Sequence, residues 1–575
     1  MSKDVIKFIF KQLKPFMIRI VIIVSCMIIV SFFGILYPML QRELFDNGIV
    51  SGDLDVVIRY TLFIFGLYII EQVLTFIQFI HYQFVSRQMS YNLMYQAVNH
   101  SIKLKMAYHK DNNFLKTIGN VYSDIGSITQ IINSGLLQTV VSFFKIIGGI
   151  IGLCLIDWRL TVFILTIVPI EIITKNFISS KRRKHFTASM KLNEKFSIWF
   201  GEIFRSIDVI KLWNLQNKQM KKFESLKKDM MKHETKMEYS DTYSNMSSQT
   251  LGMIFTHGLN LLGAILIMRN KLTIGGLFAF ISYAAYVLQP ASLLANLVYR
   301  LQNSIPAFKR FMEYFENDIE NEDGISINDS KTDVRNISFD SVIFSYGNKE
   351  AVLNSINFSI NKGEKVGFIG VNGSGKSSII SLLLRFYEPT FGTIKLNGVD
   401  IQNMALDQYR DLFCVMNQNI SLFDDNIRNN INVLENLSED EIRYYMELST
   451  AADLIDSLPK GLDSLVGFNG SKLSGGERQK VALARTLAKH GKILILDEAT
   501  ANFDLAAEKR FNQYITNSNL YDIVIVISHR EDILRRLDKI FYVDNGVIVD
   551  SGTFSELVEK NSNLFKTLAE EENQL

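Results

Sequence analysis

Residues 365–384 read KVGFIGVNGSGKSSIISLLL. Residues 365–370 have an apolar strand pattern, a glycine-rich turn follows, and residues 377–384 continue as an apolar helix pattern. The octet 370–377, GVNGSGKS, matches the phosphate-binding loop of nucleotide-binding domains in every specified position. A chance glycine turn would lack the strand, the lysine and the helix together. The stretch therefore predicts a site for the phosphates of a nucleotide.

The residue types in this loop indicate how it would hold ATP and Mg2+, the two cofactors we expect. Gly373 and Gly375 let the backbone close around phosphate oxygens. Lys376 reaches the terminal phosphates, and the Ser377 hydroxyl can bind Mg2+. The candidate nucleotide-binding residues of the loop are Gly370, Asn372, Gly373, Ser374, Gly375, Lys376, Ser377 and Ser378.

Short β-rich runs alternate with helical patterns around the loop. The runs VGFIG, FCVMN, KILILD and DIVIVIS predict an α/β domain with a largely parallel sheet. The run ILILDE, 493–498, ends in two acids. Asp497 is the candidate for holding Mg2+, and Glu498 the candidate for accepting a proton from the attacking water. Paired acids at a strand end are commonly plain surface residues, so this interpretation depends on the phosphate-binding loop.

Three further candidates carry weak signals by themselves. His529 ends the run IVIVISH and is placed to hydrogen-bond the γ-phosphate and orient water, although a lone histidine is usually structural. Gln418, in VMNQN, is a candidate for sensing Mg2+ and the attacking water. Tyr346, in FSYGN, offers a flat face for adenine, although an aromatic residue near a strand end is more often simple packing.

Bulk properties limit the class of protein. The chain has 575 residues and a formal net charge of +2. This length predicts at least two domains, and the small charge argues against a nucleic-acid-binding protein. The cysteines Cys26, Cys154 and Cys414 show no disulfide framework or zinc spacing. The N-terminus, MSKDVIKFIFKQLKPF, predicts an amphipathic helix that is retained on the membrane surface.

Hydropathy divides the chain near residue 320. A buried soluble helix can imitate one membrane crossing but not six in succession. We expect an α-helical polytopic membrane domain with long cytoplasmic extensions in residues 1–315, a polar linker in 316–333 and an α/β P-loop nucleotide-binding domain in 334–575. The six transmembrane helices are predicted near 20–40, 60–86, 134–156, 160–178, 243–268 and 272–299.

The distribution of lysine and arginine predicts the orientation. Residues 87–116 and 175–236 are basic, whereas residues 41–55 are acidic, so both termini and the nucleotide-binding domain are expected in the cytoplasm. The two basic loops have helical composition. As helices of ~25 residues at ~1.5 Å each, they would reach ~35 to 40 Å past the bilayer. We expect them to turn back near 111–117 and 208–215 and to transmit force there.

Charges within the predicted crossings bear on the cargo. Glu71, Lys145 and Glu171 lie where charge is costly and tends to face a cavity or a partner. They predict a wet chamber for a peptide or another amphiphile. The equal alternatives are that Glu71 and Lys145 pair with each other, or that all three charges lie at interfaces. Further polar residues of the predicted lining are Gln78, His257, Asn260, Tyr283, Tyr286 and Gln289.

The run SKLSGGERQK, 471–480, is a candidate anion site, because a glycine-rich turn leads into a helix N-terminus, although by itself an ordinary turn before an amphipathic helix is the simpler interpretation. The ordered set GVNGSGKS, Gln418, LSGGE, ILILDE, Asp504 and His529, behind six crossings, resembles the ATP-binding cassette exporters of half-transporter type, similar to bacterial multidrug and peptide exporters. The resemblance covers essentially the whole chain. It implies ATP-driven transport across the plasma membrane of a bacterial cell.

The family resemblance also implies a partner. In that family the LSGGQ-type sequence of one subunit contacts the γ-phosphate of ATP held by another, so Ser474, Gly475 and Gly476 would serve a second copy and Asp504 would help to link the two sites. Because Glu498 and His529 are both present, a homodimer is the simpler expectation, with a heterodimer left open.

The sequence departs from the family pattern in three places. Glu477 stands where glutamine is commoner, and its carboxylate is compatible with the first turn of a helix. Phe468 and Asn469 stand where exporters often have an acid and an arginine, and residues 501–504, ANFD, keep only the aspartate. The expected function is export of an amphiphilic peptide or drug-like molecule; a lipid or lipid-linked-sugar flippase, and an ATP-gated channel or membrane sensor, are the alternatives.

Overall fold

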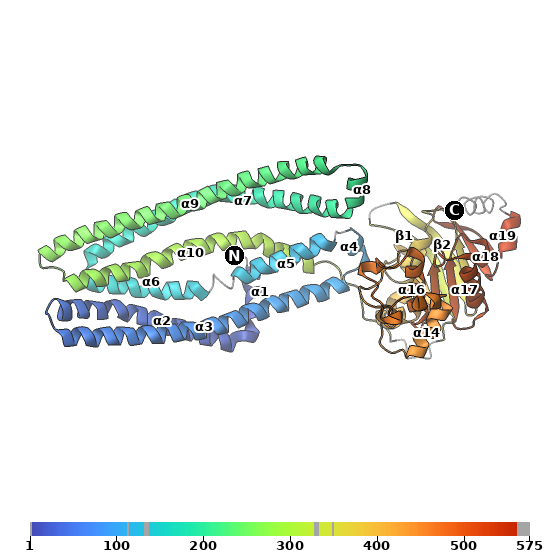
Figure 1. The fold of residues 1–575 in the computed structure, drawn as a ribbon, viewed down its shortest axis with the longest axis horizontal. Helices are drawn as coiled ribbons and strands as arrows, with labels where there is room; N and C mark the ends of the chain where they lie inside the picture. Colours follow the sequence, from blue (N-terminus) through green and yellow to red (C-terminus); the bar gives the residue numbers. More distant parts are fainter. Residues whose placement is uncertain (1–2, 112–113, 132–136, 327–332, 348–349, 561–575) are drawn as a thin grey trace. The chain divides into compact units, whose positions relative to one another are not determined.

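The computed structural model describes residues 3–111, 114–131, 137–326, 333–347 and 350–560. They divide into two compact units. Unit 1 runs to Leu104 and from His109 to Asp318, and unit 2 comprises Lys105–Tyr108 and the chain from Ile319 onward. The fold class is the one expected, with a helical domain followed by an α/β domain (Figure 1).

Helices make up nearly all of the described chain before residue 316. They are accompanied by a 3-10 turn, Lys14–Phe16, and a π-helical turn, η2, Leu44–Ile49. The helices are α1 (Lys3–Leu13), α2 (Met17–Glu43), α3 (Leu54–Lys103), α4 (Met106–Asp111), α5 (Phe114–Ile131), α6 (Leu137–Ile156), α7 (Trp158–Arg205), α8 (Ile207–Leu212), α9 (Gln216–Met268) and α10 (Ile274–Phe315).

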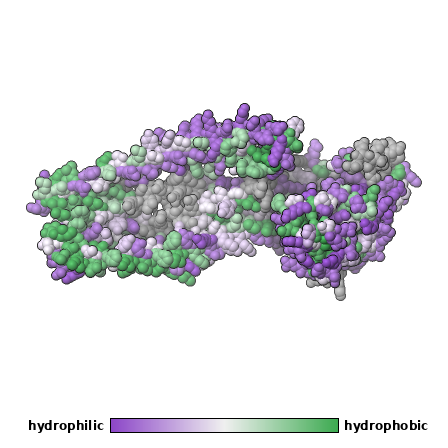
Figure 2. Space-filling model, in the orientation of Figure 1, coloured by the Kyte–Doolittle hydropathy of each residue, from purple (hydrophilic) through white to green (hydrophobic). Residues whose placement is uncertain are grey.

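Six of these helices carry apolar stretches suited to a bilayer. Four are long and apolar enough to cross it, in the regions Phe10–Ile49, Leu54–Lys103, Trp158–Arg205 and Gln216–Met268. Shorter apolar stretches lie in α6 and α10, at Ser142–Ile156 and Ile274–Leu288. Figure 2 shows hydrophobic side chains gathered over α2 and α3 and hydrophilic ones over the ends of α7 and α9 next to α8. Such a broad exposed apolar surface requires lipid around it.

Close packing joins α2, α6 and α10. Cβ atoms at Gly148 and Gly152 of α6 would collide with Ile35 and with the ring of Tyr283, so glycine lets the helices approach. The Tyr283 hydroxyl donates to the Ile35 carbonyl oxygen at 2.6 Å, and only 2% of Tyr283 is exposed. The prediction that Tyr283 lines a wet chamber is therefore wrong, because its ring and hydroxyl are used in helix packing.

The long hairpins of unit 1 turn back at short helices. Figure 1 shows α7 and α9 side by side, joined at α8, which lies within the expected reversal at 208–215. The other reversal begins earlier than expected: α3 ends at Lys103, Leu104 is extended, and α4 follows. The expected position, 111–117, includes residues 112–113, which lie outside the described part of the chain, and the start of α5.

Unit 2 contains two sheets. One has the strand order β2-β1-β4-β5, and the larger has the order β10-β9-β3-β8-β7-β6. The strands are β1 (Asn336–Ser345), β2 (Ala351–Asn361), β3 (Lys365–Ile369), β4 (Phe391–Leu396), β5 (Val399–Asp400), β6 (Phe413–Met416), β7 (Ile493–Asp497), β8 (Ile523–Ile527), β9 (Lys539–Asp544) and β10 (Val547–Gly552). Strands β6, β7 and β8 are short apolar runs buried along nearly their whole length, as expected in a parallel sheet covered on both faces.

The helices of unit 2 are short. Several of them begin after an N-cap residue of a favoured type, such as Ser438 before α14 and Asp504 before α17. They are α11 (Lys376–Leu383), α12 (Leu406–Asp411), α13 (Ile427–Ile431), α14 (Glu439–Leu448), α15 (Ala452–Ser457), α16 (Gly475–Leu487), α17 (Leu505–Asn517), α18 (Glu531–Leu534) and α19 (Phe554–Lys560), with 3-10 turns at Ile401–Asn403, Gly461–Asp463 and Phe468–Gly470.

Part of the segment expected to be a polar linker is bound to unit 2. The backbone N–H of Ile325 donates to the Asn403 carbonyl oxygen at 2.7 Å. The Glu320 carboxylate accepts two hydrogen bonds from the Arg410 guanidinium, at 2.7 and 2.8 Å. Residues 327–332 of the same segment lie outside the described chain. At Glu320, therefore, an acidic residue of the expected linker forms an ion pair at a half-buried position of unit 2.

Candidate functional site

The strand order of the larger sheet brings four sequence-predicted features to one edge. Strands β3, β8, β7 and β6 are neighbours and parallel, so their carboxyl ends lie together. The phosphate-binding loop follows β3, His529 follows β8 and Gln418 follows β6, while Asp497 ends β7 and Glu498 comes next. Ligands of open α/β sheets bind outside this edge.

Glycine is required in the phosphate-binding loop. Gly370, Gly373 and Gly375 have φ of +154°, +84° and +112°, a region that side chains disfavour. A Cβ at Gly370 would also collide with the Val543 carbonyl oxygen. Around Gly373 such an atom would meet nothing within 4 Å, so the middle of the loop is open to a ligand. Helix α11 begins directly at Lys376, which directs its N-terminus to the same place.

Polar groups inside the loop fit a phosphate. The Ser374 hydroxyl is buried and has no hydrogen-bond partner in the described part of the chain. The Lys376 ammonium donates to the carbonyl oxygens of Gly370 at 2.6 Å and Val371 at 3.1 Å. Burial lowers the pKa of Lys376, and the charges of Glu498 and Asp497 oppose that shift. An anion in the loop would satisfy the hydroxyl and stabilise the ammonium.

The two acids after the apolar strand lie in different environments. Burial, and then the charge of Glu498, raise the pKa of Asp497 to about 6, while Lys376 opposes the shift. A divalent cation would relieve both causes, and carboxylate and hydroxyl oxygens are ligands that Mg2+ prefers. Asp497 and Ser377 thus fit the expected Mg2+. The Glu498 carboxylate instead accepts the side-chain N–H of Gln418 at 2.9 Å.

The backbone of Glu498 has a strained conformation, and hydrogen bonds hold it in place. Its φ is +51°, which is unusual for a residue other than glycine. Its N–H donates to the Ile527 carbonyl oxygen of β8 at 3.0 Å. Its carbonyl oxygen accepts the side-chain N–H of Gln479 at 3.0 Å, and the Gln479 side-chain oxygen accepts the N–H of Asn502 at 2.9 Å. Gln479 therefore ties helix α16 to both ends of the loop that carries Glu498.

Gln479 was not predicted from the sequence, and neither was a second set of contacts that holds this loop in place. The buried Glu508 carboxylate pairs with the Arg530 guanidinium and accepts the Thr500 hydroxyl at 3.2 Å. Arg530 also donates to the Ala501 carbonyl oxygen at 2.9 Å. The only available signal was that Arg530 adjoins His529; nothing marked Glu508, since it looks like an ordinary acid in an amphipathic helix.

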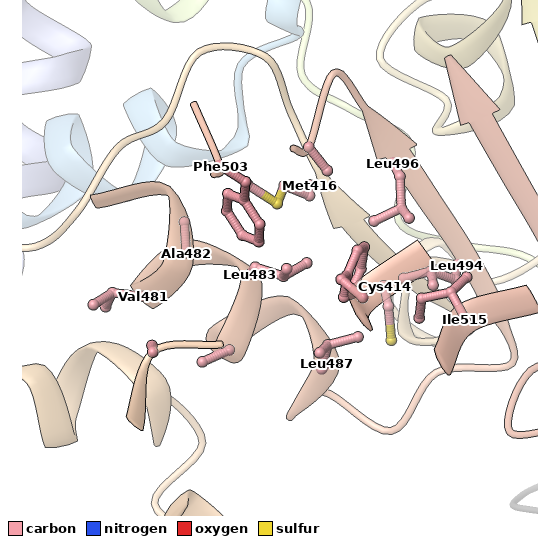
Figure 3. Close-up of a cluster of buried hydrophobic side chains, with 14 of the residues drawn as sticks. Cys414, Met416, Val481, Ala482, Leu483, Leu487, Leu494, Leu496, Phe503 and Ile515 are labelled. Atoms are coloured by element: carbon pink, nitrogen blue, oxygen red, sulfur yellow. The ribbon is translucent and has the colours of Figure 1, made fainter. Parts of the chain in front are cut away.

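Helix α16 begins at the glycine-rich run LSGGE. Ser474 is its N-cap and lies exposed at the surface, as does Gly475. Below them, the helix is fixed by apolar side chains: Figure 3 shows Leu483 and Leu487 of α16 in one cluster with Cys414 and Met416 of β6, Leu494 and Leu496 of β7, and Phe503. The serine and the glycines are thus presented outward by a rigidly packed helix.

The remaining candidates have contacts of their own. The Tyr346 hydroxyl lies 3.0 Å from the Ser378 hydroxyl, and its ring packs edge-on against Phe344. The exposed Asp504 accepts the N–H of Ala507 at 2.8 Å as the cap of α17. Asn469, with φ of +50°, accepts the N–H of Leu422 at 3.3 Å, whereas Phe468 is 81% exposed.

The charges predicted within the crossings lie in different surroundings. Glu171 forms an ion pair with Lys175, one turn further along α7, at 2.8 Å. Its charge is therefore neutralised within the same helix. The Lys145 ammonium of α6 lies 5.6 Å from the centre of the Tyr286 ring of α10. No ion pair between Glu71 and Lys145 is present among the described residues. The side chain of Gln289 lies outside them.

The fold and the site together define a class: a nucleotide-binding P-loop domain joined on one chain to a polytopic helical membrane domain. The family description "ABC transporter" matches residues 353–501, and "ABC transporter transmembrane region" matches residues 20–291. The chain belongs to the ATP-binding cassette transporters and is an exporter-type half-transporter that binds ATP and couples its hydrolysis to transport. Half-transporters of this family act as dimers. The resemblance stated from sequence is confirmed.

Relatives support the same family. The chain is 28% identical to an "ATP-dependent lipid A-core flippase" of Alcanivorax borkumensis, over 83% of this chain and 82% of that protein. It is also 28% identical to a Staphylococcus aureus ATP-binding/permease protein with a provisional name as a multidrug exporter, over 95% and 96%. The solved structure of a bacterial Atm1-family ABC exporter with ATP bound has a TM-score of 0.84 at 21% identity, covering 97% of this chain and 98% of that one.

Proposed function

We propose that this exporter moves an amphiphilic peptide or drug-like molecule across the bacterial plasma membrane as a homodimer, with two ATP molecules between its nucleotide-binding domains. The observation that carries the ATP-driven part is the meeting of the phosphate-binding loop, Asp497, Glu498, Gln418 and His529 at the carboxyl edge of four parallel strands. The basic inner loops support cytoplasmic nucleotide-binding domains and termini.

The residues of the loop bind and orient the nucleotide. Ser374 and Lys376 would hold phosphate oxygens, and Tyr346 would lie against adenine. Ser377 and Asp497, with Gln418, would hold Mg2+, which when bound neutralises charge that develops on the phosphates. Glu498 would accept the proton of the attacking water, with Gln418 orienting the carboxylate through its 2.9 Å hydrogen bond. His529 would hydrogen-bond the γ-phosphate.

The second copy would complete each site. Ser474 and Gly475 are exposed at the start of α16, and Asp504 is exposed at the start of α17. Groups that face outward in one chain are free to contact ATP held by another. Each chain has its own Glu498 and His529, so two identical copies would form two hydrolytic sites. ATP that binds more tightly to the closed pair would shift the population toward it, and hydrolysis would reverse the shift.

The cargo proposal depends on charge within the membrane domain. Lys145 lies 5.6 Å from the centre of the Tyr286 ring and forms no ion pair with Glu71 in the described chain, so both charges remain able to contact polar groups of an amphiphile. A lipid flippase is an equally well supported alternative, because relatives of similar identity carry that name. A gated channel or membrane sensor is the remaining alternative.

Reconstituted vesicles test these alternatives. ATPase activity is measured with panels of peptides, drugs and lipids, and transport is followed in parallel. Uphill accumulation of a soluble amphiphile supports export and excludes a channel, whereas ATP-dependent lipid asymmetry without such accumulation supports a flippase. Glu498→Gln should retain ATP binding and lose turnover. Continued hydrolysis in that variant contradicts the role of Glu498 as the base.

A further inference from the structure

The first turn of α16 already holds an anion of its own. One carboxylate oxygen of Glu477 accepts the backbone N–H of Ser474 at 2.7 Å. In return, the Ser474 hydroxyl accepts the backbone N–H of Glu477 at 3.3 Å. In this capping box the carboxylate is drawn to the positive end of the helix, which is also where an external anion would bind.

Of the two glycines beside this capping box, Gly475 points to a ligand outside the chain. A Cβ at Gly475 would meet no atom within 4 Å, and Gly475 occupies an ordinary helical position. Glycine forms helices less readily than alanine, and no contact within the described chain requires it at this first helical position. At Gly476 the nearest atom would be the Asn502 carbonyl oxygen at 3.0 Å. That contact accounts for Gly476 within the chain, whereas the surface at Gly475 is left open for the close approach of a group that the chain does not supply.

We propose that Glu477 competes with the partner's nucleotide: its carboxylate weakens phosphate binding at Ser474 and so sets the ATP concentration at which two subunits close. The inference rests on the proposed function, in which Ser474, Gly475 and Gly476 of one copy contact ATP held by another. A phosphate arriving there must replace the carboxylate at the Ser474 N–H or accept a like charge a few Å away.

A substitution at Glu477 can remove the carboxylate charge and keep the hydrogen bonds of the capping box with Ser474. In Glu477→Gln the amide oxygen can accept the same N–H, since glutamine also forms capping boxes. Two unit charges a few Å apart near a protein surface change an affinity by a factor of roughly ten or more. We therefore expect Glu477→Gln to lower the half-saturating ATP concentration about tenfold, with little change in the stability of α16.

The chain offers a matched control. Helix α14 has the same capping box, in which the N–H of Ser438 donates to Glu441 at 2.7 Å and the N–H of Glu441 donates to the Ser438 hydroxyl at 3.3 Å. None of the candidate site residues lies on α14. Glu441→Gln therefore makes the same chemical change in a capping box away from the nucleotide site, one in which the Ser438 hydroxyl also donates to the Glu441 carboxylate at 2.8 Å.

The experiment uses the full chain in lipid nanodiscs. Equilibrium ATP binding and the ATP dependence of hydrolysis are measured for wild type, Glu477→Gln, Glu441→Gln and Ser474→Arg, together with melting temperatures. The proposal expects the half-saturating ATP concentration to fall only in Glu477→Gln, with similar melting temperatures for both glutamine variants. A shift of equal size in both glutamine variants, no shift in Glu477→Gln or a shift to higher ATP overturns it.

Ser474→Arg separates this proposal from the proposed function. If Ser474→Arg abolishes hydrolysis but Glu477→Gln behaves as wild type, the shared nucleotide site stands and the competitor role of Glu477 is wrong. If Ser474→Arg hydrolyses ATP at the wild-type rate, the shared site itself is wrong, and the competitor role is overturned with it.

Discussion

Replacing Gln479 with methionine should slow ATP hydrolysis without removing ATP binding. Gln479 is buried, and its amide holds both the Glu498 carbonyl oxygen at 3.0 Å and the Asn502 N–H at 2.9 Å. Methionine has a similar length and no comparable donor or acceptor. The substitution therefore keeps the packing of α16 and releases the two hydrogen bonds that tie the helix to the loop carrying Glu498.

The expected changes in unfolding free energy and in kcat follow from the two hydrogen bonds that the substitution removes. Leaving a partly buried donor or acceptor unpaired costs about 1 kcal/mol or more each, so the free energy of unfolding of unit 2 should fall by roughly 2 kcal/mol. The left-handed backbone of Glu498 stores strain of order 1–3 kcal/mol that these bonds oppose. If about 1.4 kcal/mol of that restraint is lost, the carboxylate leaves its catalytic position often enough to lower kcat about tenfold.

The assay compares kcat for ATP, equilibrium ATP binding and chemical unfolding. Thr486→Val is the matched control, because Thr486 lies on the same helix and its hydroxyl is within hydrogen-bond distance of the carbonyl oxygens of Ala482 at 2.9 Å and Val415 at 3.3 Å, neither of which belongs to the loop that carries Glu498. This control should lose about 1 kcal/mol of stability and keep its kcat. If Gln479→Met keeps the wild-type kcat, or if Thr486→Val slows hydrolysis equally, Gln479 does not position Glu498.

Three further predictions concern other parts of the chain. Glu320→Gln should lower the unfolding free energy by about 1–2 kcal/mol, because it weakens the two-bond pair with Arg410, and unchanged denaturant midpoints would contradict this. Tyr283→Phe should cost about 1 kcal/mol by removing the bond to Ile35, seen as a lower melting temperature in detergent, and no change would show that the hydroxyl is not needed for packing. Removing Mg2+ with a chelator should stop hydrolysis, and added Mg2+ or Mn2+ should restore it; hydrolysis that continues in excess chelator would exclude the Mg2+ role of Asp497 and Ser377.

Many features of this protein could be predicted from its sequence because they depend on local chemistry. The phosphate-binding loop needs glycine, lysine and serine at set spacings because backbone conformation and charge act within a few residues, so GVNGSGKS was recognisable without the fold. Two local features were also readable but were overlooked. The spacing Ser474-x-x-Glu477 is that of a capping box, and Glu171 and Lys175 have the i, i+4 spacing of a helical ion pair.

Other residues acquired meaning only in three dimensions. Gln418 and His529 were weak candidates along the chain, and they join the site because β6 and β8 are neighbours of β7. Gln479 could not be found from sequence, since a glutamine in an amphipathic helix has no distinguishing pattern. Tyr283 was misjudged because its partner, the Ile35 carbonyl oxygen, belongs to a helix almost 250 residues away.

The sequence by itself determined the two kinds of domain, the ATP site and the family, because apolar periodicity and phosphate-binding geometry are short-range properties. Only the tertiary structure decided which buried side chains hold the strained Glu498, which charge in the membrane domain is already paired and how much of the acidic linker is docked. Those outcomes depend on which strands and helices become neighbours, and burial and hydrogen-bond partners are set by that arrangement and not by position along the chain.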